Sequence, residues 1–169
     1  MNAGGALWLP PAVWAEVQAL ATLLPARGWR LATAESCTGG LVAAACTARA
    51  GSSDWFERGW VTYANAAKTA ELGVPAALIE AHGAVSEPVA RAMAAGAAAR
   101  AGVAAALAIT GIAGPSGGSA AKPVGTVWFA WSVDAQLQAE CVRFDGDRAA
   151  VRAQAVLHAL AGLRRRLAG

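Results

Sequence analysis

The stretch Thr33-Ala-Glu-Ser-Cys-Thr-Gly-Gly40 decides the fold that we predict for this chain. The segment from Arg30 to Ala34 predicts a short strand, and the small, mostly apolar residues at 39–50 predict a helix. A chain that passes directly from a strand into a helix exposes the side chain at the turn, and the unpaired N–H groups at the helix start suit an oxyanion or a phosphate. Gly39 and Gly40 leave room for a ligand and lower the helix propensity, a cost that a purely structural segment would avoid.

The hydroxyl of Ser36 is the candidate nucleophile of this turn, which is analogous to a nucleophile elbow without the GxSxG spacing. The competing interpretation is that Ser36 or Thr38 only caps the helix. Cys37 is a rival nucleophile, but its side chain should point away from that of Ser36, so we expect Cys37 to belong to the core. Glu35 either orients the turn or caps it, and the sequence leaves both roles open.

A lysine stands in an unusual place after the next strand. The pattern predicts a strand at 59–63 and a helix at 65–72 with Asn65 as N-cap, which places Lys68 near the positive end of the helix dipole. Such local conflicts concentrate at functional sites. A serine needs a base, and a lysine can serve when burial and a helix N-terminus lower its pKa. Tyr63 could relay a proton or fix the lysine; the alternative is an exposed Lys68 and an interfacial Tyr63.

A glycine-rich loop is the second candidate binding segment. Thr110-Gly-Ile-Ala-Gly-Pro-Ser-Gly-Gly-Ser119 follows a predicted buried strand and frees the backbone to wrap an anion. It matches neither a Walker A loop nor GxGxxG, and a flexible surface loop is the alternative. Lys122 or Arg148 could neutralise a phosphate held there. The substrate-binding positions that we name in the loop are Thr110, Gly111, Gly114, Gly117 and Gly118.

Strand and helix patterns interleave along the chain and predict an α/β fold, with a mixed sheet and helices packed on it. In such sheets ligands collect at the carboxyl ends of strands. We expect one domain over 1–169, with 1–10 as an irregular arm. The other predicted elements are a helix from Pro11 to about Leu24 that Pro25 and Gly28 end, a helix at 86–101 capped by Ser86 and Glu87, strands at 104–110, 126–133 and 138–144, and a last helix that Asp145 or Asp147 caps.

The composition excludes several classes of protein. Of the 169 residues, 56% are hydrophobic and 15% are charged, which excludes a disordered chain. Three cysteines without a CxxC spacing argue against a disulfide framework or a zinc site, and they predict a reducing, cytoplasmic location. Arg100 and several glycines interrupt the small apolar residues at 92–113, so we expect no membrane span.

Charged and histidine residues add two further expectations. The net charge of +3 includes Arg164-Arg165-Arg166, which we interpret as a solvated last helical turn and not as a nucleic-acid site. His82 and His158 are the only histidines, and both are interpreted as structural. We therefore expect no catalytic metal.

Four motifs in order resemble the CinA C-terminal-domain family over residues 16–167. They are the stretch at 33–40, Trp55-Phe-Glu-Arg-Gly-Trp-Val-Thr-Tyr63 with Asn65 and Lys68, His82-Gly-Ala-Val-Ser-Glu-Pro88, and Thr110-Gly-Ile-Ala-Gly-Pro115 running to Lys122-Pro-Val-Gly-Thr-Val127. Gly146-Asp147-Arg148 also matches the family. The resemblance implies a three-layer αβα fold with a mixed, mostly parallel sheet, no cofactor and association into homo-oligomers.

The resemblance also implies an activity and its residues. Some members of this family are nicotinamide-nucleotide amidases, so the expected reaction converts nicotinamide mononucleotide into nicotinate mononucleotide and ammonia. Ser36 would be the nucleophile, with Lys68 and Tyr63 as its partners. Nucleotide contacts are implied at Thr38, Gly39, Gly40, Asn65 and the 111–118 loop. The larger members carry an N-terminal pyrophosphatase domain, which we expect this chain to lack.

Two other functions remain open at this point. One is a module that binds a pyridine nucleotide without hydrolysing it, and binding without ammonia release would identify it. The other is a serine/lysine amidase that acts on a substrate other than a nucleotide.

Overall fold

The computed structural model describes residues 8–168 and has a five-stranded sheet with the strand order β2-β1-β3-β4-β5. Strands β2, β1 and β3 run parallel, and β4 runs antiparallel to both of its neighbours. The elements are α1 (Pro11–Ala26), β1 (Leu31–Glu35), α2 (Leu41–Thr47), a 3₁₀ turn (Ser52–Asp54), β2 (Phe56–Val61), α3 (Asn65–Leu72), α4 (Ala76–His82), α5 (Glu87–Ala101), β3 (Ala105–Gly111), β4 (Thr126–Val133), β5 (Gln136–Arg143) and α6 (Arg148–Ala168).

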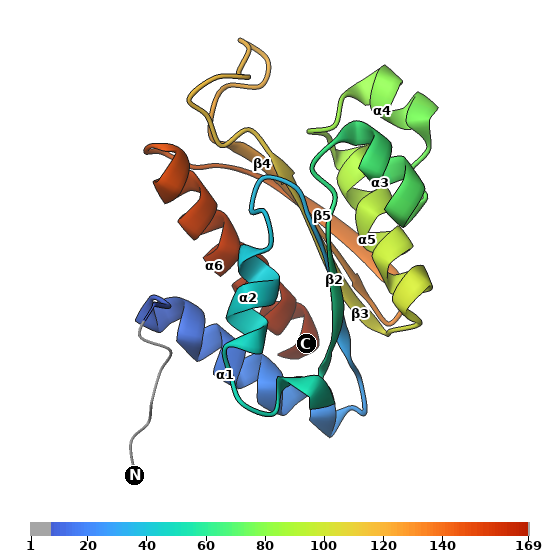
Figure 1. The fold of residues 1–169 in the computed structure, drawn as a ribbon, viewed down its shortest axis with the longest axis vertical. Helices are drawn as coiled ribbons and strands as arrows, with labels where there is room; N and C mark the ends of the chain where they lie inside the picture. Colours follow the sequence, from blue (N-terminus) through green and yellow to red (C-terminus); the bar gives the residue numbers. More distant parts are fainter. Residues whose placement is uncertain (1–7, 169) are drawn as a thin grey trace.

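Helices cover both faces of the sheet, so the predicted three-layer α/β architecture is confirmed (Figure 1). Helices α1, α2 and α6 lie on one face, and α3, α4 and α5 lie on the other. Side chains of the central strands alternate between the two faces because successive residues of a strand point in opposite directions. Thus Leu107 and Ile109 belong to the core under α6, whereas Ala106 and Ala108 belong to the core under α5.

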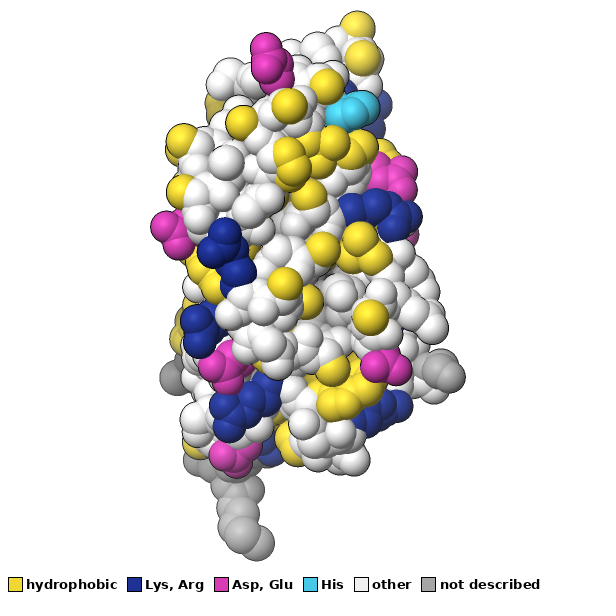
Figure 2. Space-filling view, turned by 90° about the vertical axis from the view of Figure 1, so that its right-hand side faces the viewer, with side chains coloured by type: hydrophobic (Ala, Val, Ile, Leu, Met, Phe, Trp, Pro, Cys, Tyr) yellow, Lys and Arg dark blue, Asp and Glu magenta, His cyan; other side chains and the backbone are white. Residues whose placement is uncertain are grey.

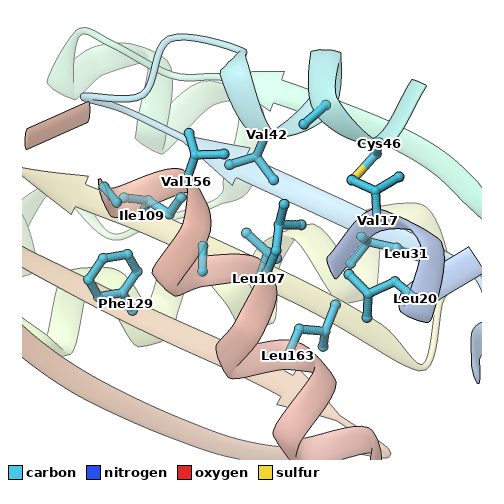
Figure 3. Close-up of a cluster of buried hydrophobic side chains, with 14 of the residues drawn as sticks. Val17, Leu20, Leu31, Val42, Cys46, Leu107, Ile109, Phe129, Val156 and Leu163 are labelled. Atoms are coloured by element: carbon cyan, nitrogen blue, oxygen red, sulfur yellow. The ribbon is translucent and has the colours of Figure 1, made fainter. Parts of the chain in front are cut away.

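The two cores differ in the size of their side chains. The core between the sheet and α1, α2 and α6 holds the large aliphatic and aromatic residues, including Leu31, Leu107, Phe129 and Leu163 (Figure 3). The core under α5 is rich in alanine on both the helix and the strands. Small residues on both sides allow the helix to approach the sheet closely, and this accounts for much of the alanine in the composition.

Helix α6 packs on the sheet through an apolar stripe of residues spaced three and four apart. Val156, Leu160, Leu163 and Leu167 are all buried. Gly162 allows the close approach, because a Cβ there would lie 2.3 Å from the ring of Trp131. The start of the helix is capped by Asp147, whose carboxylate accepts the N–H of Ala150 at 2.8 Å.

Several predicted boundaries were wrong. Pro25 lies inside α1 and does not end it, because a proline in the last turn removes only one hydrogen bond and the N–H of Arg27 closes the helix on Leu24 O (3.0 Å). Asn65 is the first residue of α3, and Ala64 occupies the N-cap position. Ser86 stands at the N-cap of α5, but its hydroxyl donates to Gly83 O (2.8 Å).

Two elements departed from the sequence patterns. Strand β2 begins at Phe56 and ends at Val61, whereas 59–63 was predicted; it is an edge strand, and an edge tolerates the charged Glu57 and Arg58. Helix α4 had not been predicted. The predicted arm at 1–10 falls mostly outside the described residues, of which only 8–10 precede α1.

The surface over α3, α4 and α5 carries lysine, arginine and acidic side chains interspersed with small hydrophobic groups (Figure 2). Within residues 8–168, no helix combines the length and the apolar character that crossing a bilayer requires.

Candidate functional site

The candidate residues meet at the carboxyl end of the parallel strands. Ser36 follows β1, Tyr63 follows β2 and Thr110 lies at the end of β3, and these three strands are neighbours in the sheet. Parallel strands present their carboxyl ends at one edge, where ligands of α/β proteins bind. The first turn of α6 reaches the same edge, since Arg148 contacts both Tyr63 and Gly114.

Ser36 and Lys68 are in direct contact. The Lys68 amino group lies 3.2 Å from Ser36 Oγ, and it also lies 2.8 Å from Thr62 O and 3.2 Å from Tyr63 O. The Lys68 side chain is 1% exposed, so the exposed lysine that was the alternative interpretation is wrong. The turn that carries Ser36 and the helix that carries Lys68 are therefore brought together as the sequence predicted.

The surroundings of Lys68 favour its neutral form. Burial lowers the pKa of the Lys68 amino group below the ordinary value of a lysine. A neutral amine has two hydrogens and one lone pair. The carbonyls of Thr62 and Tyr63 can accept the two hydrogens, which turns the lone pair toward the hydroxyl of Ser36. This geometry can move a proton from the serine to the lysine.

The turn at 36–40, which we call the nucleophile turn, depends on its two glycines. Gly39 (φ 59°) and Gly40 (φ 95°) both adopt left-handed backbone conformations that other residues rarely adopt. Glu35 holds the far end of the turn: its buried carboxylate accepts N–H groups of Gly40 (3.1 Å), Val42 (3.1 Å) and Ala43 (2.9 Å). Glu35 thus holds the turn and also satisfies the first N–H groups of α2, whose N-cap residue is Gly40, so both roles that the sequence left open are compatible with its contacts.

Cys37 belongs to the core, as predicted. Its side chain is 4% exposed, and burial raises the pKa of its thiol to about 11. A thiol with that pKa is almost fully protonated at neutral pH and is a poor nucleophile. Gly111 makes room for this packing, because a Cβ there would lie 3.1 Å from Cys37 Sγ.

Tyr63 touches Lys68 only through its backbone. Its side chain is 58% exposed, and its hydroxyl accepts a hydrogen bond from Arg148 at 3.0 Å. One of the two predicted roles of Tyr63 was to fix the lysine. The contact with Lys68 agrees with that role, but it is made by the backbone carbonyl of Tyr63. The phenol lies at the rim of the site, against α6.

Arg152 is a site residue that the sequence reasoning missed. Its guanidinium donates to Cys37 O (3.1 Å) and Thr38 O (3.2 Å), and so it grips the nucleophile turn from α6. Its spacing in the sequence could have identified it, because Arg152 stands four residues after Arg148 and residues four apart share one face of a helix.

The structure separates the two candidate phosphate ligands. Lys122 donates to His82 O (2.8 Å) at the end of α4, and it ties the loop to that helix. Arg148 donates to Gly114 O (3.0 Å), next to a cleft of about 500 Å³. The cleft is lined by Ala113, Pro115, Val124, Gly146, Asp147, Arg148, Ala149 and Arg152.

The remaining predicted contacts are spread more widely. Thr110 donates its hydroxyl to Ala84 O (2.9 Å), and Asn65 is exposed at the start of α3. Gly117 and Gly118 are exposed in the loop beyond β3, which projects from the sheet (Figure 1). Thr38 is fully buried, and within the part of the chain that the structure describes its hydroxyl has no partner.

The histidines take no part in this site. His82 ends α4 and is exposed, and His158 packs against Phe129 with ring centroids 4.6 Å apart. Among residues 8–168, no group of three or more His, Cys, Asp or Glu side chains is placed to hold a metal ion.

Comparison with known proteins identifies similar chains. The family model described as the CinA C-terminal domain matches residues 15–167. The nicotinamide-nucleotide amidohydrolase PncC of Pseudomonas putida is 56% identical over 134 residues, which cover 79% of this chain and 84% of that protein. A competence-damage inducible protein of Symbiobacterium thermophilum is 55% identical over 161 residues, but these cover 90% of this chain and only 38% of that longer protein.

A solved structure supports the same relationship. The competence/damage inducible protein CihA of Agrobacterium tumefaciens superposes with a TM-score of 0.91 at 41% identity, and the match covers 95% of this chain and 98% of that one. The similarity thus extends over both layers of helices and the whole sheet.

Proposed function

Because the chain belongs to the CinA C-terminal domain family, we propose that it hydrolyses the carboxamide of nicotinamide mononucleotide to give nicotinate mononucleotide and ammonia. The observation that carries the proposal is the contact of 3.2 Å between the buried Lys68 amine and Ser36 Oγ. Support for the substrate comes from the similar proteins named as nicotinamide-nucleotide amidohydrolases.

In the first half of the reaction, neutral Lys68 takes the proton of Ser36 as Ser36 Oγ attacks the carboxamide carbon. Backbone N–H groups of the nucleophile turn stabilise the negative charge that develops on the carboxamide oxygen. The C–N bond then breaks, and the ammonium of Lys68 returns its proton to the leaving nitrogen, so that ammonia departs and an ester to Ser36 remains.

The second half runs through the same groups. Lys68 is neutral again after ammonia leaves, and it takes a proton from the water that attacks the ester. Ser36 leaves with that proton, and the nicotinate product is released. No redox step occurs, and each proton that Lys68 takes is returned within the same half-reaction.

The site also offers a place for each end of the substrate. The pyridinium ring of the substrate is cationic, and the exposed aromatic face of Tyr63 can stack against such a ring. We assign the 5′-phosphate to the cleft beside Arg148, because the planar guanidinium is a donor suited to phosphate. Lys122 is a weaker candidate, because it is not among the residues that line this cleft.

Two further features belong to this proposal. Cys37, Cys46 and Cys141 are free thiols and Cys141 is exposed, which fits a reducing compartment such as the cytoplasm. We also propose that identical copies associate in solution, as the family resemblance implies, and sedimentation of the purified chain would test this.

Assay of purified protein with a chelator present would test the activity and its substrate. We expect stoichiometric ammonia and nicotinate mononucleotide from nicotinamide mononucleotide, and a much lower kcat/KM on the riboside that lacks the phosphate. Tight binding of the nucleotide without ammonia release would overturn the proposal in favour of a binding module. Equal rates on the riboside would instead point to an amidase without a phosphate subsite.

A further inference from the structure

Three of the five N–H groups of the nucleophile turn, those of Ser36, Gly39 and Gly40, are engaged within the protein. Gly39 N–H donates to Ser36 O (3.0 Å), and Gly40 N–H donates to the Glu35 carboxylate (3.1 Å). Among the described residues, the N–H groups of Cys37 and Thr38 donate to no protein acceptor. These two are therefore the backbone donors of the turn that no protein acceptor occupies.

The first amides of α2 cannot take this role. Glu35 accepts the N–H groups of Val42 and Ala43, so the helix start is already satisfied from inside the protein. An oxygen of the substrate at that point would compete with a buried carboxylate. The oxyanion donors must come from the turn itself.

The contact of Arg152 with Cys37 O fixes where the N–H of Thr38 points. In a planar trans peptide the C=O and the N–H point in opposite directions. Arg152 Nε holds Cys37 O on the side of α6, so the N–H of Thr38 in the same peptide points away from α6. Lys68 reaches Ser36 from α3, which lies on the other face of the sheet from α6 (Figure 1). The free N–H of Thr38 is thus aimed toward the reacting side of Ser36.

We propose that the N–H groups of Cys37 and Thr38 bind the oxyanion, and that Arg152 is the positioning residue for the peptide group between Cys37 and Thr38, which carries the second of these donors. This rests on the proposed function, because it assigns a role in the same attack by Ser36. Cys37 directly follows the nucleophile, which is the position that supplies an oxyanion donor in a nucleophile elbow.

The chemistry of arginine suits this task better than that of lysine. The planar guanidinium presents donors in a fixed fork, and two of its nitrogens contact successive carbonyls at 3.1 Å and 3.2 Å. Its positive charge polarises the peptide that it binds, which makes the N–H on the far side a stronger donor. Arg152 is itself held firmly, because Val151 and Ala155 beside it on α6 are fully buried.

The test is the rate at which a small alkyl fluorophosphonate modifies Ser36, followed by mass spectrometry. In that reaction Ser36 Oγ bonds to phosphorus, fluoride leaves, and the phosphoryl oxygen takes the place of the oxyanion. We expect Arg152→Ala to slow the modification about 100-fold, a loss typical of a disturbed oxyanion site. Arg152→Lys should lose about tenfold, because an ammonium lacks the fork. The matched control is Arg164→Gln, which removes an arginine from α6 that binds Glu16 (2.6 Å), and it should label like the native chain.

Turnover of nicotinamide mononucleotide gives a second readout, in which kcat should fall with the labelling rate while KM stays unchanged. Thermal unfolding shows whether each variant is folded. If Arg152→Ala is not folded, the labelling rate of Arg152→Lys decides the test. Labelling of a folded Arg152 variant at the rate of Arg164→Gln would overturn the assignment. A chain that labels as expected but releases no ammonia would instead show that the proposed substrate is wrong and leave the oxyanion assignment standing.

Discussion

Replacing Lys68 by methionine removes the proposed base while nearly preserving the volume of a side chain that is only 1% exposed. The native amine contacts Ser36 Oγ at 3.2 Å and two carbonyls, and no other charged side chain hydrogen-bonds to Ser36 among the described residues. A general base contributes about 10²–10⁴-fold to a rate. We therefore expect Lys68→Met to lower kcat/KM by at least about 100-fold, or about 2.7 kcal/mol of transition-state stabilisation.

The pH dependence provides the sharper assay. Burial lowers the pKa of Lys68, and only the neutral amine can accept a proton. The kcat/KM of the native chain should therefore rise with pH and level off above that lowered pKa, and this rise should disappear in Lys68→Met. Retention of native turnover by the variant, or an unchanged pH profile at a reduced rate, would refute the role of Lys68 as base.

The same shift predicts an effect on stability. The unfolded chain binds more protons than the folded chain between the lowered pKa of Lys68 and the ordinary value, so the native state gains stability as pH rises through that window. Below the lowered pKa, Lys68 is charged in both the folded and the unfolded chain, and the burial of its ammonium then destabilises the native state by the full amount. The unfolding free energy of the native chain relative to Lys68→Met should thus increase with pH in urea titrations.

Three further substitutions test the neighbours of this pair. Glu35→Gln leaves one oxygen for three N–H donors, and it should cost about 1.5–3 kcal/mol in urea unfolding together with a fall in kcat; unchanged values of both would contradict the capping role. Tyr63→Phe should keep kcat within about fivefold, since Lys68 contacts only the carbonyl of Tyr63, and a loss of about 100-fold would restore the proton relay. Cys37→Ala should keep its capacity for labelling at Ser36 and most of its turnover, because the buried thiol has a pKa of about 11; complete inactivation of a folded variant would favour Cys37 as nucleophile.

The central part of the fold could be predicted because its signals are local. The stretch at 33–40 joins a buried strand to a helix through two glycines that adopt positive φ, and a turn at Asp134-Ala135 joins β4 and β5, which correspond to the last two predicted strands. The apolar stripe of α6 is spaced at three and four residues, and it is buried along its length. These features depend on residues close together in the chain.

The features that were missed depend on distant partners. In the sequence, Arg152 is one more polar residue of α6. Only the fold brings it to the carbonyls of Cys37 and Thr38, which are 115 and 114 residues away. Helix α4 has seven residues, and so short a helix forms through tertiary packing more than through its own propensity. Lys122 and Arg148 looked equivalent as cations, until the structure placed one against α4 and the other beside the cleft.

The contact between Ser36 and Lys68 also joins residues that are distant in the chain, but it was predicted. Each residue alone had an ordinary structural explanation, and the pair became a site because β1 and β2 are neighbours whose carboxyl ends meet. The Glu35 carboxylate accepts three N–H groups, and this role could not be assigned from the sequence because the donors lie up to eight residues ahead, across the turn.

Ammonia release by Ser36→Ala, measured beside the native chain on nicotinamide mononucleotide, tests the central claim most directly. The Ser36 hydroxyl is the group that Lys68 contacts at 3.2 Å, and alanine removes it with little change in packing. We predict that the native chain releases ammonia and that the rate of the Ser36→Ala variant is lower by at least about 1,000-fold. Thermal unfolding should show that the variant is folded. A folded Ser36→Ala variant that turns over within about tenfold of the native rate would contradict the account.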